Sequence, residues 1–186
     1  MVGSRLKPLC AVALVTAVCG LVASACGEHD PGVDEPAREG LAIDLGGVGY
    51  NAFLTRELNL SIPPDKALYD GPAAPPGSAL YGVFIQACNR GDDPAVPTDD
   101  FVVEDNQGNE FRPLALPQSN QLAYHARQLG KDQCIPEAGS FAQQGPTAGS
   151  MLLFEFPLDD AENRPLELII TAQGEEPEQK RIELDL

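Results

Sequence analysis

Alternation of apolar and polar residues with a period of two is the pattern that most constrains this chain. Residues 181–186 read Arg-Ile-Glu-Leu-Asp-Leu, and residues 166–171 read Leu-Glu-Leu-Ile-Ile-Thr. Successive side chains of a β-strand point to opposite faces of its sheet. The alternation therefore predicts two strands, each with a buried face.

Residues 80–88 and 151–156 are nearly continuous apolar runs. Such runs, without regular polar alternation, are typical of central strands. These two segments and the two alternating ones are predicted to carry most of the core.

A β-hairpin is predicted where residues 101–105 and 109–112 flank Asn106-Gln107-Gly108. Glycine supplies the positive φ that a three-residue hairpin turn requires. A calcium loop over residues 105–110 is the alternative. That segment lacks the alternating carboxylates and the distal bidentate glutamate of an EF-hand.

Further strands are expected within residues 41–45 and 50–60, and only residues 122–129 could form a short helix. The chain contains 17 prolines and 18 glycines, which punctuate these short segments. Seven or eight short strands without alternating helices predict an all-β fold, a single antiparallel two-sheet sandwich over residues 41–186.

Residues 1–25 have the parts of an export signal peptide. Arg5 and Lys7 precede an apolar run over residues 9–22, and small residues follow at positions 23–25. This arrangement is typical of a segment that is removed after export.

The segment that ends at Cys26 resembles the lipobox of bacterial lipoproteins, with Ala23 at the position where leucine is commonest. The resemblance implies a lipid on Cys26 that anchors the protein to the extracytoplasmic face of the cell membrane. Ordinary cleavage after Ala25, which would release the protein, is the alternative.

Cysteine number bears on this choice, because removal of residues 1–25 leaves Cys26, Cys88 and Cys134. An odd number is unfavourable in an oxidising compartment, and lipidation of Cys26 would leave an even pair. Cys88 and Cys134 are then expected to form a disulfide. A free, reactive thiol pair is the alternative, although no CxxC spacing supports a redox role.

Residues 26–40 are expected to be a lipidated N-terminus followed by a flexible acidic linker. The segment is polar, rich in proline and glycine, and has five acids against one base. Such a composition buries too little apolar surface to fold alone. As a random coil it would hold the domain roughly 20 Å from its anchor.

The mature chain is strongly acidic, with 10 basic and 28 acidic residues and therefore a formal charge of −18. Such a surface repels nucleic acid, and it lacks the basic stripe that phosphate contacts need. Solubility explains the charge most simply; binding of a cationic partner or of metal ions is the alternative.

Catalytic and cofactor motifs are missing from the sequence. His125 is the only histidine after residue 40, and neither a nucleophile elbow nor metal-ligand, haem or phosphate-loop spacing accompanies it. No cofactor is expected. The weak candidates for a cation site are the paired acids of predicted loops, Asp99, Asp100, Asp159 and Asp160.

Residues 81–89, 100–113, 149–154 and 164–170 together resemble a family of exported bacterial proteins that carry an immunoglobulin-like (telokin-like) domain of unknown function. The resemblance implies an immunoglobulin-like sandwich over residues 41–186 and brings no catalytic residues. We expect a non-enzymatic binding or scaffolding module whose loops meet a protein, peptide or small ligand. The alternative is an accessory protein, weak hydrolase or cation-binding domain that uses loop carboxylates.

Overall fold

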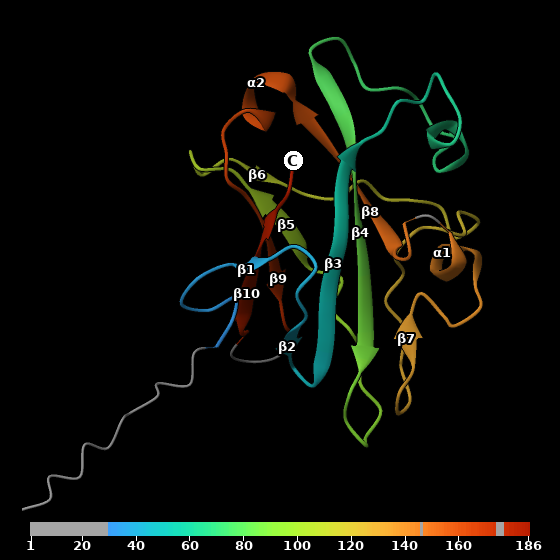
Figure 1. The fold of residues 1–186 in the computed structure, drawn as a ribbon, viewed down its shortest axis with the longest axis vertical. Coiled ribbons are helices and arrows are strands. Elements are labelled where there is room, and N and C mark those ends of the chain that lie inside the picture. The colour runs from blue at the N-terminus through green and yellow to red at the C-terminus, as the bar shows by residue number, and fades with distance from the viewer. Residues whose placement is uncertain (1–29, 146, 174–176) are drawn as a thin grey trace, which may run out of the picture.

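The computed structural model describes residues 30–145, 147–173 and 177–186, which form two packed β-sheets (Figure 1). The predicted signal peptide and Cys26 lie outside the described residues. The first sheet has the strand order β1 (Ala37–Arg38), β10 (Gln179–Leu184), β9 (Leu166–Thr171), β5 (Phe101–Glu104) and β6 (Glu110–Phe111).

The second sheet is built around the 12-residue strand β4 (Ser78–Asn89). One edge of β4 pairs with β3 (Val48–Glu57), which in turn pairs with β2 (Ile43–Leu45). The other edge pairs with β8 (Ser150–Pro157) and then with β7 (Cys134–Ile135). Among the described strands, all pairings are antiparallel except that of β1 with β10. The predicted all-β, two-sheet sandwich is therefore confirmed.

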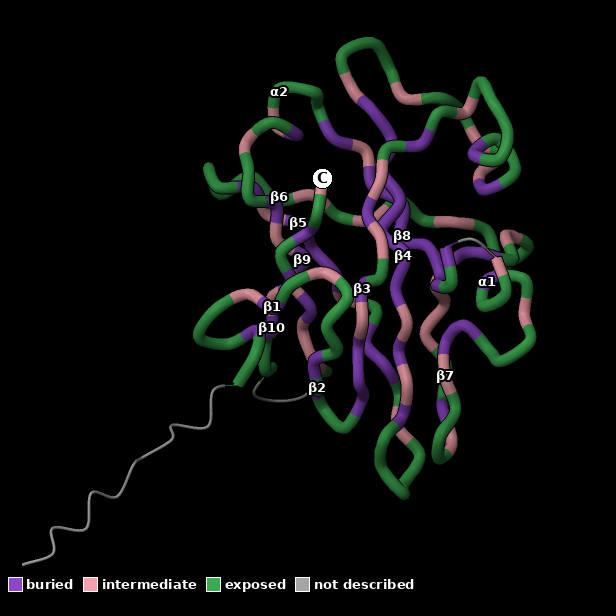
Figure 2. Tube along the Cα trace, in the orientation of Figure 1, coloured by how far each residue is buried: buried purple, intermediate pink, exposed green. Residues whose placement is uncertain are grey.

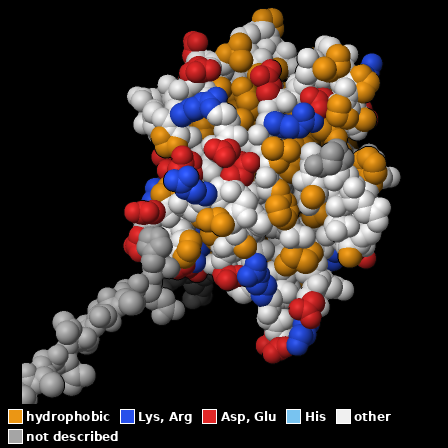
Figure 3. All heavy atoms as spheres, in the orientation of Figure 1, with side chains coloured by type: hydrophobic (Ala, Val, Ile, Leu, Met, Phe, Trp, Pro, Cys, Tyr) orange, Lys and Arg blue, Asp and Glu red, His pale blue; other side chains and the backbone are white. Residues whose placement is uncertain are grey.

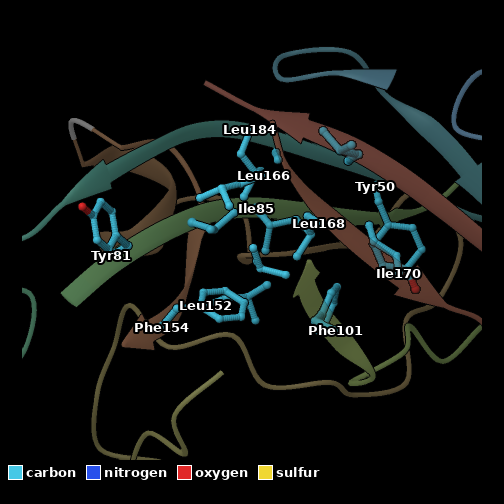
Figure 4. Close-up of a cluster of buried hydrophobic side chains, with 14 of the residues drawn as sticks. Tyr50, Tyr81, Ile85, Phe101, Leu152, Phe154, Leu166, Leu168, Ile170 and Leu184 are labelled. Atoms are coloured by element: carbon cyan, nitrogen blue, oxygen red, sulfur yellow. The ribbon is translucent and has the colours of Figure 1, made fainter. Parts of the chain in front are cut away.

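Strands β4 and β8 are buried on both faces (Figure 2), which explains their nearly continuous apolar sequences. Alternate residues of β4, such as Val83 and Ile85, point into the core between the sheets. Leu80 and Phe84 belong to a second buried cluster. Figure 4 shows the first cluster, in which side chains of the two sheets meet.

The second cluster is completed by residues from segments outside the two sheets. Leu58 and Leu68 come from the segment between β3 and β4, which contains the short 3-10 helix η1 (Asp65–Ala67). Leu122 and Ala142 come from the segment between β6 and β8, which contains α1 (Phe141–Gln144). Loops thus form a third, irregular layer over the second sheet.

Two predicted local features have different outcomes. The hairpin is confirmed, since Glu104 pairs with Glu110 and Gly108 has a φ of +83°. The prediction of a helix over residues 122–129 is wrong, because the Met151 backbone in β8 forms hydrogen bonds with both Leu122 and Tyr124 and so holds the start of the segment against the sheet. The described α-helices are instead α1 and α2 (Leu158–Ala161), and no helix among the described residues is long and apolar enough to cross a membrane.

Cys88 and Cys134 form a disulfide across the β4–β7 pair. The two residues are direct cross-strand partners, with Cα atoms 4.1 Å apart. The bond ties the short strand β7, and the loops on either side of it, to the central strand.

The linker expected before residue 41 differs from what the structure shows. Residues 30–40 pack on the sandwich, and β1 within them adds a parallel strand to β10. The Lys180 side chain is only 5% exposed and its Nζ lies 2.5 Å from Asp30 Oδ1. The Gly32 carbonyl accepts a hydrogen bond from the Arg181 amide. Composition alone predicted flexibility because these partners lie about 150 residues away in the sequence.

Glu39 connects this N-terminal segment to both sheets. Its carboxylate accepts hydrogen bonds from the amide and hydroxyl of Thr55 in β3, at 2.9 and 2.6 Å. It also accepts one from the Asp185 amide, just after β10, at 3.1 Å. Thr55 is buried, so without Glu39 two of its polar groups would lose their partner.

We expect Glu39→Ala to lower the free energy of unfolding by about 2–3 kcal/mol, because hydrogen bonds to a charged group are lost and buried donors are left unpaired. Urea denaturation measures the change. Glu35→Ala is the matched control, since the Glu35 side chain is exposed and makes no hydrogen bond within the described residues. Equal effects of the two substitutions would contradict the bridging role of Glu39.

Candidate functional site

A pocket of about 330 Å³ lies at the seam between the two sheets, and we call it the seam pocket. Residues 112–116 cross from β6 toward β8, where the Leu114 amide donates a hydrogen bond to the Leu153 carbonyl. The lining is mostly apolar, with polar groups from Asp99, Tyr124 and His125. The apolar side chains come from Phe101, Leu114, Leu116, Met151 and Leu152.

The floor of the seam pocket is held by aromatic residues and by Thr98. The rings of Phe101 and Tyr124 meet edge to face with centroids 5.1 Å apart. The Tyr124 hydroxyl donates to the Thr98 carbonyl, and the Thr98 amide donates to the Tyr50 hydroxyl. Burial raises the pKa of Tyr124, and the charges of Tyr50 and Asp99 raise it further, so this phenol keeps its proton.

Asp99 is placed at the seam pocket by the turn that precedes β5. The Thr98 hydroxyl accepts a hydrogen bond from the Asp100 amide at 3.0 Å, and the Thr171 amide donates to the Asp100 carbonyl. These bonds fix the backbone on the C-terminal side of Asp99. Its side chain is exposed, and Oδ1 has one long contact, 3.4 Å to the Gln173 amide nitrogen.

His125 contributes an imidazole to the same pocket. Its Nδ1 lies 3.2 Å from the side-chain amide nitrogen of Gln118. Its Nε2 is buried and has no hydrogen-bond partner among the described residues. The sequence drew attention to His125 as an isolated histidine, and the structure places it in the lining of the same pocket as Asp99.

A histidine and an aspartate in one pocket are also components of acid–base sites. In a hydrolytic triad, however, Nδ1 of the histidine donates to an orienting carboxylate. Here Nδ1 meets Gln118 instead. Among the described lining residues there is no serine, threonine or cysteine. The pocket combines apolar walls with a few polar groups.

The four acids named as weak cation candidates do not come together. Asp99 and Asp100 lie beside the end of β9 marked by Thr171, whereas Asp159 and Asp160 belong to α2, which precedes the start of β9 at Leu166. Asp100 pairs with Arg112 at 3.1 Å. Within the described residues no three acidic, histidine or cysteine side chains are grouped so that they could hold a metal ion.

Asp105, the first acid of the possible calcium loop, receives hydrogen-bond donors. Its carboxylate accepts from the Gln107 amide and from both the amide and the side chain of Asn109, each at 2.8 Å. The Asn163 side chain donates at 3.0 Å. Burial acts to raise the pKa of Asp105, but these hydrogen bonds outweigh it and lower the pKa from 3.8 to about 2. Asp105 therefore stabilises the hairpin.

The face shown in Figure 3 carries Lys and Arg side chains scattered among Asp and Glu. No basic stripe crosses this face.

No protein-family model matches the chain, and no curated protein matches it. The telokin-like resemblance therefore stays a prediction. Solved structures show a weak likeness of fold. The yjhA protein of Bacillus subtilis has 8% identity and a TM-score of 0.48, over 80% of this chain and 99% of its own.

Two further solved structures are similar at the same level. One is the ycdA protein of Bacillus subtilis, described as a candidate lipoprotein, with 12% identity and a TM-score of 0.48 over 78% of this chain and 38% of its own. The other is an uncharacterized β-sandwich protein of Clostridium difficile, with 10% identity and a TM-score of 0.45 over 81% and 97% of the two chains. Likenesses this weak carry no argument about function.

We expect Asp105→Asn to lower the free energy of unfolding by roughly 1–2 kcal/mol at pH 7, because the charge-assisted hydrogen bonds weaken. The lowered pKa means that the carboxylate stabilises the fold above pH 3.8 and loses this effect as the pH falls to about 2. The stability gap between the two proteins should therefore shrink over that range.

Denaturation series at several pH values measure this gap. Asp93→Asn, at an exposed acid whose side chain makes no hydrogen bond within the described part of the chain, should show no such change. A gap for Asp105→Asn that stays constant down to pH 2 would contradict the assignment.

Proposed function

We propose that this protein is a lipoprotein anchored on the extracytoplasmic face of the cell membrane, whose sandwich is a non-enzymatic binding module. The observation that supports binding is the seam pocket, since about 330 Å³ is within the size range of small-ligand sites. The aromatic and Thr98 contacts hold the pocket floor in place before any ligand arrives. Such pre-organisation lowers the entropy cost of binding.

Because residues 30–40 pack on the sandwich, the proposed anchor at Cys26 would lie close to the folded domain. Only three residues separate Cys26 from Asp30, where the packed part of the chain begins. Whatever conformation these residues adopt, four Cα–Cα steps span at most about 14 Å. A lipid on Cys26 would therefore hold the β1–β10 edge of the sandwich close to the membrane surface, instead of on a long tether.

We expect Cys26→Ala to abolish incorporation of a labelled fatty acid and to remove the protein from the membrane fraction, because the thioether attachment is lost. Cys19→Ala is the matched control, since this cysteine belongs to the predicted signal peptide and should leave the label unchanged. Labelling that persists in Cys26→Ala would refute the proposed anchor.

We expect a small apolar alcohol such as cyclohexanol to bind the seam pocket of the detergent-solubilised full-length protein. Saturation-transfer NMR on the alcohol detects the binding. Ala115→Trp should abolish the signal, because Ala115 is an exposed residue of the pocket lining and the indole would fill the opening.

Ala42→Trp is the control, at an exposed position outside the pocket lining. A signal that survives Ala115→Trp would refute the seam pocket as the binding site.

A further inference from the structure

A second pocket lies in the third layer of the fold, and we call it the layer pocket. Its volume is about 250 Å³, and its lining consists of Ala67, Leu68, Asp70, residues 119–122 and Phe141. The η1 segment and α1, which supply both ends of this lining, lie on the same side of the second sheet (Figure 1). Pockets for drug-sized ligands start at about 300 Å³, so one compact unit suits this volume best.

Hydrogen bonds join the loops that form the layer pocket. The Asn120 side chain donates to the Leu68 carbonyl at 3.1 Å and accepts from the Leu122 amide at 2.9 Å. Leu68 and Leu122 are buried in the second cluster, and their packing holds both loops on the second sheet. The walls of the pocket are therefore in place before a ligand arrives, which lowers the entropy cost of binding.

Phe141 gives the layer pocket an exposed aromatic ring. It is the first residue of α1, which begins where the Ser140 hydroxyl accepts a hydrogen bond from the Gln143 amide at 3.3 Å. The next residue, Ala142, packs in the second cluster. Neighbouring residues of a helix point in directions about 100° apart, so burial of Ala142 turns Phe141 outward. Phe141 is 59% exposed, more than any other large hydrophobic residue in the described part of the chain.

Three polar side chains, those of Asp70, Ser119 and Gln121, border the same pocket. Each is exposed and makes no hydrogen bond or ion pair within the described residues. Ser119 and Gln121 flank Asn120, whose bond to Leu68 brings their loop to the segment that contains Asp70. These side chains offer a carboxylate that accepts, and a hydroxyl and an amide that both donate and accept.

Charge narrows the choice of ligand further. No lysine, arginine or histidine belongs to the described lining, so the carboxylate of Asp70 is the charged group of the layer pocket. An anion would be repelled by it. A purely apolar ligand would remove water from the polar side chains without replacing their hydrogen bonds. A cation would meet Asp70 and the Phe141 ring but leave the donors of Ser119 and Gln121 unused.

We propose that the layer pocket binds a neutral sugar ring. Such a ring has a face of C–H groups and a rim of hydroxyls. The C–H face packs on the aromatic ring of Phe141. The hydroxyls donate to Asp70 and exchange hydrogen bonds with Ser119 and Gln121. This site goes beyond the function proposed for the seam pocket, with which it shares no lining residue among those described.

Methyl β-D-glucopyranoside and methyl β-D-galactopyranoside are the probes that test this proposal. They are added to the full-length protein in a detergent without a sugar headgroup and followed by saturation-transfer NMR. Both should bind, with the strongest saturation on ring C–H groups. Choline, the cationic comparison, should bind about ten-fold more weakly.

Phe141→Leu keeps an apolar side chain but removes the aromatic face, so it should weaken both glycosides about five-fold. Phe53→Leu is the matched control, at an exposed phenylalanine outside the layer pocket. Equal losses in the two variants would contradict stacking on Phe141. A thermal unfolding midpoint equal to that of the parent protein shows that each variant is folded.

Gln121→Ala tests the hydrogen-bonding rim. It should weaken the glycosides about three-fold, because hydrogen bonds to their hydroxyls are lost, and it should leave choline unchanged. Gln128→Ala is the matched control, at an exposed glutamine that lies outside both pockets and makes no side-chain hydrogen bond within the described residues. Tighter binding of choline than of either glycoside would overturn the proposal in favour of a cation site.

The two pockets are tested separately. Ala115→Trp, which fills the seam pocket, should abolish the cyclohexanol signal and leave the glycosides unchanged. Failure of both glycosides to bind while cyclohexanol binds would refute the sugar site and leave the seam pocket intact. Binding of the glycosides without cyclohexanol would support the sugar site and refute the seam pocket.

Discussion

Burial of strand β4 on both of its faces is the constraint on which the rest of the structure depends. Both faces of this strand carry apolar side chains. Exposure of either face to water would therefore lose a large part of the hydrophobic stabilisation. The first sheet covers one face of β4, and the loops of the third layer cover the other (Figure 2). Those loops must therefore be ordered, although they contain little regular secondary structure.

The seam pocket arises from the way the loops pack on the second sheet. The chain leaves the first sheet after β6, crosses to β8, and bonds to it through Leu114 and Tyr124. This crossing closes the side of the sandwich and leaves a cavity between Phe101 on one sheet and Leu152 on the other. His125 follows directly in the same segment and lines the pocket, so one connection both closes the sandwich and contributes to the cavity wall.

The N-terminal segment shows how a few charged contacts can order a polar sequence. Lys180 is buried against Asp30, and Glu39 joins β3 to the end of β10. Each contact satisfies a buried polar group that would otherwise destabilise the fold. The same contacts bring the packed part of the chain to within a few residues of Cys26, so anchoring and folding are coupled in the proposed lipoprotein.

The sequence by itself determined the long strands, the hairpin at Gly108 and the class of fold, because period-two alternation and turn chemistry are local properties that the chain carries wherever it packs. Only the tertiary structure decided that residues 30–40 are packed, that residues 122–129 are not helical, and that Asp99 and His125 share a pocket. Each of these depends on partners far away in the sequence: Lys180 for Asp30, Met151 for Leu122, and the β6-to-β8 crossing for His125. Burial and long-range hydrogen bonding outweigh local composition, and neither can be read from a short window of residues.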